Sequence, residues 1–182
     1  MNYPQKPFCI NTGFMINQPI GYEREIPFKL PRYEFDGDFD VNDLEGTIIL
    51  NRTQSGLRTF GEFSATIEAE CVRCLEIFLQ GINTSFEELF TFNRKEISED
   101  EQLIPEDGFI DFEALLRDYL LLALPISPIC RADCLGLCSI CGENLNQRTC
   151  SHHQGSNNHN ELLQPDGAGG HLGKGKGSTA QF

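Results

Sequence analysis

Residues 58–71 read RTFGEFSATIEAEC and carry the clearest periodic pattern in the chain. From Glu62 to Glu70, polar and apolar side chains alternate without interruption. A period of two residues places one set of side chains on each face of a β-strand. The pattern therefore predicts a strand with one buried face and one face in contact with water.

Shorter patterns on both sides extend this strand into an antiparallel meander. Strands are expected over residues 25–30, 44–52, 75–79 and 82–92, with a turn at 54–56. Pro27 and Pro31 lack a backbone N–H and place the first of these strands at a sheet edge. Residues 36–43 and 93–107 are rich in charge and turn residues, which favours loops.

One helix is expected after the meander, over residues 112–123. Asp111 is a candidate N-cap, Glu113 lies in the electropositive first turn, and Pro125 ends the helix. Apolar residues nearly encircle it, which predicts a largely buried helix. The fold class expected is α+β: an antiparallel β meander or partly closed barrel with one buried helix and a cysteine-rich zinc-knuckle region.

Composition divides the 182 residues into three parts. Residues 1–24 show no period and are expected to be irregular. Residues 25–150 hold the domain, because 40% of the chain is apolar and one core is what that length supports. Residues 151–182 are rich in Gly, His and Asn, and such a segment buries too little apolar surface to offset its ordering entropy, so a disordered tail is expected.

In that tail two lysines and two acidic residues cancel. The whole net charge of −13 therefore lies on the rest of the chain. Residues 1–150 therefore hold 12 basic and 25 acidic side chains, from totals of 14 and 27. Nucleic-acid binding depends mainly on neutralising phosphates with Lys and Arg. An acidic domain favours a basic protein partner, and direct RNA binding would require a local basic face.

No segment approaches the ~20 apolar residues that span a bilayer. The N-terminus also lacks the charged and apolar regions of a signal peptide. We therefore expect a cytoplasmic protein with no membrane partner. In that compartment the eight cysteines are expected to be metal-bound thiolates rather than disulfides.

Two C-x-x-C pairs, Cys71/Cys74 and Cys138/Cys141, carry the most specific chemical signal. A gap of two residues lets one tight turn direct both sulfurs at a single ion. Four thiolates would complete a closed tetrahedral Zn²⁺ site, which has no open position for substrate and is therefore structural. A metal ion that closes so long a loop would stabilise the folded state by roughly 4 kcal/mol at most.

Cys130, Cys134 and Cys150 leave other ligand sets open. A compact site would use Cys130, Cys134, Cys138 and Cys141. A second ion could instead be held by Cys130, Cys134 and Cys150 with His152 or His153. Cys9 is expected to be a free thiol. A thiol–disulfide couple is a further alternative, although no helix start follows Cys74 as that chemistry usually requires.

Catalytic motifs are missing from the sequence: it contains no P-loop, G-x-G-x-x-G, G-x-S-x-G or H-E-x-x-H. No pair of acidic residues stands out as a general acid and base. We therefore expect a protein that is not an enzyme.

Five short blocks resemble the YceD-like family in order and spacing. They are Cys71-Val-Arg-Cys74-Leu75, Phe86-Glu87-Glu88-Leu89-Phe90, Ile110-Asp111, Leu121-Leu122-Ala123-Leu124-Pro125, and Cys138-Ser-Ile-Cys141-Gly142 with Leu145-Asn146. The resemblance covers roughly residues 20–150. It implies a role in ribosome biogenesis, in the accumulation of large-subunit (23S) ribosomal RNA, and no known catalytic residues.

Three functions follow, in order of preference. The first is a non-enzymatic ribosome-assembly factor that binds a basic ribosomal protein or a pre-50S particle, with any contact to rRNA being indirect. The second is an RNA-binding zinc module that uses Arg73, Arg131 and Arg148. The third is a C-x-x-C redox protein.

Overall fold

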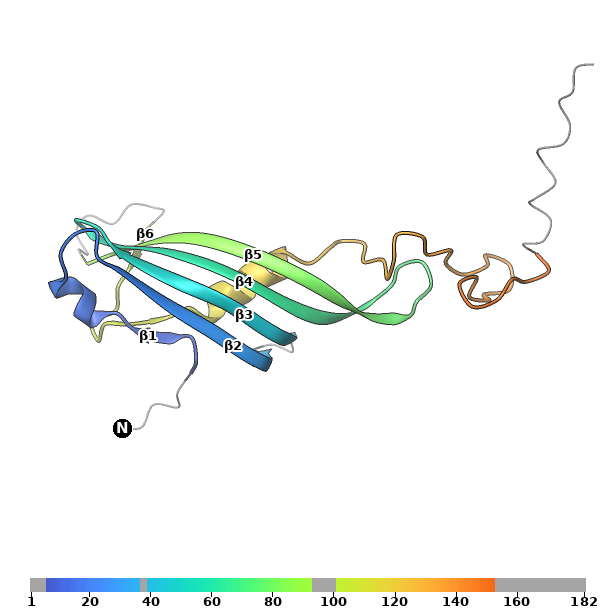
Figure 1. Cartoon of the computed structure of the whole chain (residues 1–182), viewed down its shortest axis with the longest axis horizontal. Coiled ribbons are helices and arrows are strands. Elements are labelled where there is room, and N and C mark those ends of the chain that lie inside the picture. The colour runs from blue at the N-terminus through green and yellow to red at the C-terminus, as the bar shows by residue number, and fades with distance from the viewer. Residues whose placement is uncertain (1–5, 37–38, 93–100, 153–182) are drawn as a thin grey trace, which may run out of the picture.

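A five-stranded sheet dominates the computed structural model, which describes residues 6–36, 39–92 and 101–152 (Figure 1). Its strands follow the order β2-β3-β4-β5-β6. Their bounds are β2 (Glu23–Phe35), β3 (Phe39–Arg52), β4 (Gly56–Glu70), β5 (Ile77–Thr91) and β6 (Glu101–Leu103). The first four form the antiparallel meander that the alternating pattern predicts.

The sheet is open, and the expected partly closed barrel is wrong. β6 joins β5 in parallel at one edge, and β2 forms the other edge of the described sheet. Closure would require β2 to accept another strand along its outer side, where Pro27 and Pro31 donate no hydrogen bond. The inner face is covered by a helix instead of by a continuation of the sheet.

That helix is α1 (Glu113–Leu122), which packs across the inner face of the sheet (Figure 1). Leu116 and Leu120 are fully buried, and the ring of Tyr119 stacks on Phe86 with centroids 5.3 Å apart. The expectation of a largely buried helix holds for one side only, because Leu122 is 82% exposed. Asp111 accepts a hydrogen bond from the amide of Glu113 at 3.0 Å, but the N-cap position is held by Phe112 and not by Asp111 as expected.

Residues 6–24 contribute to the core, which corrects the expectation of an irregular stretch for this described part of residues 1–24. β1 (Cys9–Asn11) pairs with β7 (Phe109–Asp111) in a second, two-stranded sheet. A 3-10 helix follows at Gly13–Asn17 and buries Met15. Phe8 is fully buried, with its ring 5.1 Å from that of Phe28. A strand of three residues is too short to show a period, so its partner 100 residues away decides its structure.

The core lies between the inner face of the sheet, α1 and the N-terminal segment. Its fully buried members come from all three layers: Phe8, Met15, Phe35, Val41, Leu44, Ile48, Leu50, Leu57, Phe112, Leu116 and Leu120. Gly61 lies on the inner face of β4, where a Cβ would stand 2.2 Å from the ring of Phe86. The two residues pair across β4 and β5, so the missing side chain makes room for the aromatic ring.

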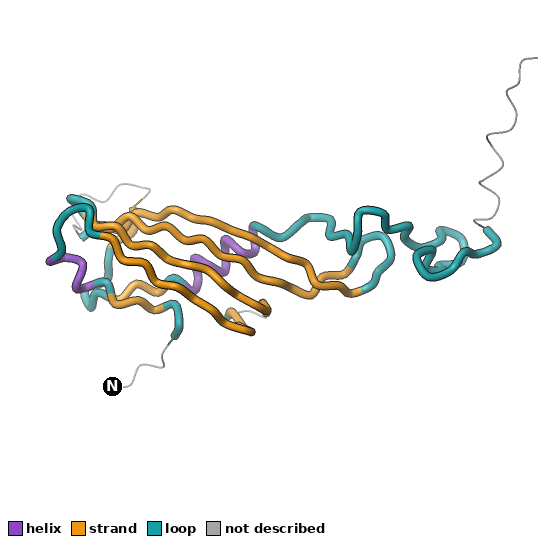
Figure 2. Tube along the Cα trace, viewed as in Figure 1, coloured by secondary structure: helices purple, strands orange, loops and turns teal. Residues whose placement is uncertain are grey.

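β4 and β5 continue beyond the rest of the sheet as a two-stranded arm (Figure 2). Pairing between β3 and β4 ends at Thr66, whereas pairing between β4 and β5 runs on to Glu70 and Ile77. We call residues 67–70 and 77–80 the arm. An isolated two-stranded hairpin is marginally stable in water, so the arm depends on what holds its end.

Two sequence expectations concern residues that the structure covers only in part. The loop expected over 36–43 is shorter, because β3 begins at Phe39, and the loop expected over 93–107 includes β6. The disordered tail expected over 151–182 lies almost wholly outside the described residues. Within the part of the chain described, no helix has the length and apolar character to cross a membrane.

Candidate metal centres

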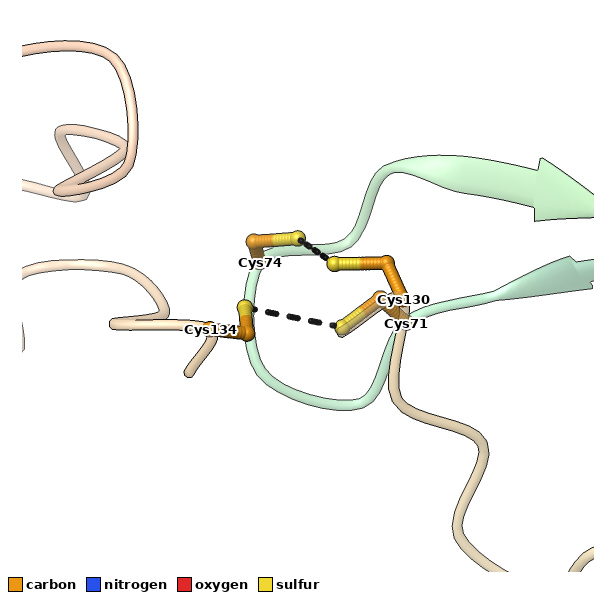
Figure 3. A group of neighbouring side chains, drawn as sticks. All are labelled: Cys71, Cys74, Cys130 and Cys134. Carbon is orange, nitrogen blue, oxygen red and sulfur yellow. Dashed lines mark hydrogen bonds between the residues drawn. The ribbon is translucent and has the colours of Figure 1, made fainter. Parts of the chain in front are cut away.

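The arm ends in a tight turn that carries the first C-x-x-C pair. The amide of Cys71 donates to the carbonyl of Glu76, and the amide of Leu75 donates to the carbonyl of Cys71, both at 2.9 Å. This turn brings the side chains of Cys71 and Cys74 to the same side (Figure 3). The turn therefore forms the first half of a knuckle.

The second C-x-x-C pair repeats the same hydrogen bonds. The amide of Cys138 donates to the carbonyl of Glu143, and the amide of Gly142 donates to the carbonyl of Cys138, again at 2.9 Å. The residue after the second cysteine has positive φ in both turns, 59° at Leu75 and 73° at Gly142. The two knuckle turns thus share one backbone design.

The first group of ligands contains Cys71, Cys74, Cys130 and Cys134, and their sulfurs lie within 4.8 Å of one another (Figure 3). The Sγ atoms of Cys71 and Cys134 are 3.9 Å apart, and those of Cys74 and Cys130 are 3.7 Å apart. Four sulfurs at 2.3 Å from a central ion stand about 3.8 Å apart in a tetrahedron. The spacing therefore suits a tetrahedral metal site and is far longer than the ~2.05 Å of a disulfide.

This first group has its own small apolar core. Cys71, Cys74 and Cys134 are buried, and Phe78, Ile129 and Leu137 pack against them. Phe78 points from the inner face of the arm, and Ile129 lies in the segment that follows α1. The group therefore joins the arm to that segment in a largely buried site, with Cys130 partly exposed.

The second group contains Cys138, Cys141, Cys150 and His152, whose ligand atoms also lie within 4.8 Å of one another. Cys138 is buried and Cys150 is partly buried, whereas Cys141 and His152 are exposed. Three thiols and one imidazole are a frequent donor set for structural zinc. This group lies at the far end of the described chain and is more open to solvent than the first.

The structure does not bring the two C-x-x-C pairs to one ion, as the leading sequence expectation proposed. Cys71 and Cys74 meet Cys130 and Cys134, while Cys138 and Cys141 meet Cys150 and His152. Neither the compact set nor the set of Cys130, Cys134 and Cys150 with a histidine is formed. Every cysteine named as a primary or alternate ligand nevertheless falls in one of the two groups, and Cys9 lies in neither.

Backbone pairing explains this grouping. The amide of Val72 donates to the carbonyl of Pro128 at 3.0 Å, and the amide of Leu137 donates to the carbonyl of Arg73 at 3.0 Å. These bonds hold residues 128–137 against the first turn, so Cys130 and Cys134 reach its sulfurs. Cys138 comes after that contact, where the chain has already turned away.

Asn146 is a residue whose role the cysteine pattern did not reveal. Its Nδ2 donates to the Sγ of Cys134 at 3.3 Å, and its Oδ1 accepts from the amide of Leu135 at 2.8 Å. Side chains that hydrogen-bond to metal ligands orient them and tune the metal. Asn146 comes from the second knuckle and serves the first group, so it couples the two.

Hydrogen bonding lowers the pKa of Cys71 and Cys134 in the first group and of Cys138 in the second, which favours their thiolate forms. Burial acts to raise the pKa of Cys71, but hydrogen bonds from the backbone of Cys130, Cys74 and Arg73 outweigh it and lower the pKa to about 6. Hydrogen bonds from the backbone of Cys141 and Ile140 lower the pKa of Cys138 to about 6. Burial raises the pKa of Cys130 to about 12. A metal ion would supply the positive charge that such close thiolates need.

The knuckle arginines are engaged locally. Arg73 donates to the carbonyl of Cys134 at 3.0 Å, Arg131 pairs with Asp133 at 3.4 Å, and Arg148 pairs with Glu143 at 3.0 Å. We call residues 71–76 and 130–150 the knuckle end. They hold three basic and three acidic side chains, so this end of the molecule is neutral.

Comparison with known proteins places the chain in a family. Residues 60–165 match the model of the family described as large ribosomal RNA subunit accumulation protein YceD. The chain belongs to this family. The match spans most of β4, all of β5 and α1, and both cysteine groups, whereas β2 and β3 lie outside it.

Relatives in actinobacteria and plants resemble parts of the chain. An uncharacterised protein of Mycobacterium leprae is 34% identical over 47% of this chain and 41% of its own length. One of Mycobacterium tuberculosis is 36% identical over 48% of this chain and 44% of its own. The large ribosomal RNA subunit accumulation protein YCED homolog 1 of Arabidopsis thaliana, a chloroplastic protein, is 29% identical over 61% of this chain.

The chain thus spans about two-fifths of the length of the curated relatives it matches. No solved structure matches it significantly. Membership of the family supports a role related to the large ribosomal subunit.

Proposed function

We propose that this protein is a non-enzymatic assembly factor of the large ribosomal subunit. In this proposal two structural Zn²⁺ ions hold its knuckle end, and it acts in the cytoplasm by binding a basic ribosomal protein or a pre-50S particle. The observation that carries the proposal is the family match across both cysteine groups. Contact with rRNA is then indirect.

The donor chemistry supports zinc at both groups. Four thiols, or three thiols and an imidazole, are soft and borderline ligands that suit Zn²⁺ and disfavour Mg²⁺ or Ca²⁺. The first group uses all four positions for protein sulfur and lies in an apolar environment. A closed site of this kind supports the fold, which fits a binding protein better than an enzyme.

Charge supports a protein partner over RNA. The body of the molecule holds the whole net charge of −13, because the knuckle end is neutral and the C-terminal segment cancels. The three arginines that an RNA-binding module would use are held by the local contacts described above. Ribosomal proteins are basic as a class and suit an acidic surface.

Redox exchange is a weaker candidate. A reactive C-x-x-C pair usually sits at a helix N-terminus with one thiol accessible. Here β5 follows Cys74, and both Cys71 and Cys74 are buried.

Gradient sedimentation of cell extracts tests the proposal. The full-length protein, detected by a small epitope tag, is expected to migrate with large-subunit precursors and to be absent from mature 70S ribosomes. Depletion is expected to lower large-subunit rRNA relative to small-subunit rRNA. Free migration at the top of the gradient, together with an unchanged rRNA ratio, would remove the proposed function.

A further inference from the structure

The outer face of the arm is apolar and acidic at once, and nothing in the described chain covers it. Ile77 and Leu79 are 62% and 66% exposed, and they stand directly opposite Glu70 and Glu68 across β4 and β5. Register partners in an antiparallel pair share one face of the sheet. We call these four side chains the arm face.

The arm face does not serve the protein's own packing. The inner side of the arm presents Phe78 to Ile129 and the first cysteine group, so the contacts that hold the arm are on that side. Two large aliphatic side chains in adjacent positions are therefore left in water beside two carboxylates. Covering them with the apolar side of a partner would remove this surface from water, which is favourable.

The carboxylates of this face form no ion pair with a cation of the described chain, and Arg32, which lies within electrostatic range of Glu68, bonds to Asp40 instead. Glu62, Glu68 and Glu70 take part in none of the ion pairs found within residues 6–36, 39–92 and 101–152. The nearby Arg32 is paired with Asp40 at 2.5 Å, and Lys29 with Glu45 at 2.6 Å. The negative charge of the arm face is therefore available to a partner.

The arm face continues into the body of the sheet without a break. Pairing between β4 and β5 keeps one register from Glu70/Ile77 to Glu62/Ser85, with the small pair Thr66/Gly81 between. It leads to a hollow of about 570 Å³ lined by Glu45, Glu62, Ser64, Asn83 and Ser85. Eight residues of strand measure about 26 Å, which is the length of about 17 residues of helix.

We propose that the arm face and this hollow bind a basic amphipathic segment of a protein partner, with aliphatic side chains over Ile77 and Leu79 and Lys or Arg beside Glu62, Glu68 and Glu70. The negative charge of the three carboxylates favours a basic protein segment over RNA or a second copy of the chain. RNA phosphates would be repelled by the three carboxylates. A second copy joined by the same face would place like charges opposite one another, since a two-fold interface is self-complementary. The proposal deepens the proposed function and rests on it for the nature of the partner.

A defined peptide tests the surface. The probe is a fluorescent 18-residue helix with Lys along one side and Leu along the other, and a peptide of equal charge with Gln in place of Leu is its control. Binding to the full, zinc-loaded protein is measured by fluorescence anisotropy. Ile77→Ser combined with Leu79→Ser is expected to weaken binding by about tenfold or more, and the Gln peptide is expected to bind the wild type that much more weakly.

Glu68→Gln combined with Glu70→Gln is expected to weaken binding by roughly three- to tenfold at low salt, with the difference shrinking as salt is added. Matched controls lie in or near the 3-10 helix and the start of β2, elements at the other end of the sheet from the arm (Figure 1): Ile16→Ser with Ile20→Ser, and Glu23→Gln with Glu25→Gln. They are expected to bind like the wild type. All four variants change exposed side chains, and equal zinc content and circular dichroism confirm that they fold.

Three results would overturn this inference. The first is equal loss of binding in the arm-face and control variants. The second is binding of a single-stranded RNA oligonucleotide that the arm-face variants abolish. The third is a wild-type dimer in sedimentation that Ile77→Ser with Leu79→Ser turns into a monomer. Sedimentation with ribosomal precursors tests the proposed function separately, so a failure there leaves the peptide result standing.

Discussion

Leu75 and Gly142 occupy the same position in the two knuckle turns, with φ of 59° and 73°. A residue with a Cβ pays roughly 1–2 kcal/mol in this left-handed region. At Gly142 no other atom would lie within 4 Å of an added Cβ, so backbone strain is the whole cost there. Gly142→Ala is therefore expected to lower the free energy of unfolding by about 1 kcal/mol in urea denaturation of the zinc-loaded protein.

Gly81→Ala is the matched control, because Gly81 lies in β5 and also has open space around a Cβ, but its φ is not positive. It is expected to be neutral or to add stability by reducing the entropy of the unfolded chain. An equal loss at both positions would show that the left-handed turn is not what makes Gly142 necessary.

Asn146 is expected to tune the first metal group. Asn146→Ala removes the hydrogen bond to the Sγ of Cys134 and leaves the amide of Leu135 without its acceptor. Loss of such a partner typically lowers metal affinity by about 10- to 100-fold. Competition with a coloured zinc chelator measures this, and Asn83→Ala on the outer face of β5 is the control. Unchanged zinc affinity in Asn146→Ala would contradict the assigned role.

Acid is expected to release zinc. The pKa of Cys71 is lowered from 9.0 to about 6, so the folded state favours its thiolate. A lowered pKa contributes stability that is present above the ordinary value of 9.0 and is lost as pH falls through about 6. Protons compete with the metal for the same sulfurs, so zinc release, followed with an indicator dye, is expected at or below about pH 6. Release already at pH 8 would contradict this ligand geometry.

At the scale of elements, the arm is the part of the fold that we expect to depend most on a metal ion in the first cysteine group. It extends past the last pairing of β3 with β4, and the first cysteine group holds its end. Removing zinc with a chelator is expected to speed amide hydrogen exchange in residues 67–70 and 77–80 well before β3. Hydrogen exchange with mass spectrometry measures both regions at once, and uniform exchange across the sheet would show that the metal supports the whole fold.

The element scale also shows where a local pattern suffices. Glu62–Glu70 alternates over nine residues, and its alternation correctly predicts the faces of β4. β1 and β7 have three residues each, and only their mutual pairing makes them strands. The apolar run and Pro125 locate helix α1 to within a residue or two, whereas its N-cap at Phe112 and its exposed side, with Leu122, are apparent only from the structure.

At the scale of the whole molecule, the two groups predict two zinc ions per chain. Cys71→Ser and Cys138→Ser are each expected to lose one ion and keep the other, because they belong to different groups. Elemental analysis of the purified protein measures the ratio, and Cys9→Ser is the control because Cys9 belongs to neither group. One ion in the wild type and none in either variant would contradict two separate sites and support a single site shared by both C-x-x-C pairs.

Charge is also distributed at this scale. The neutral knuckle end and the acidic sheet lie at different parts of one elongated molecule (Figure 1). The arm joins them, so its outer face is the proposed binding surface and its end is held by the first cysteine group. This arrangement lets zinc stiffen the surface that we propose as the docking site without making the ion part of the contact.

The sequence alone determined the meander, the helix, the acidic balance, the cysteines that act as candidate ligands and the family resemblance, because each depends on residue type and local spacing. Tertiary structure alone decided that the sheet stays open, that residues 6–24 complete the core, and that Cys71 and Cys74 meet Cys130 and Cys134. The physical reason is that C-x-x-C spacing specifies a turn and two sulfurs but carries no information about the other two. Those depend on backbone hydrogen bonds such as Val72 to Pro128 and Leu137 to Arg73, which join segments more than 50 residues apart.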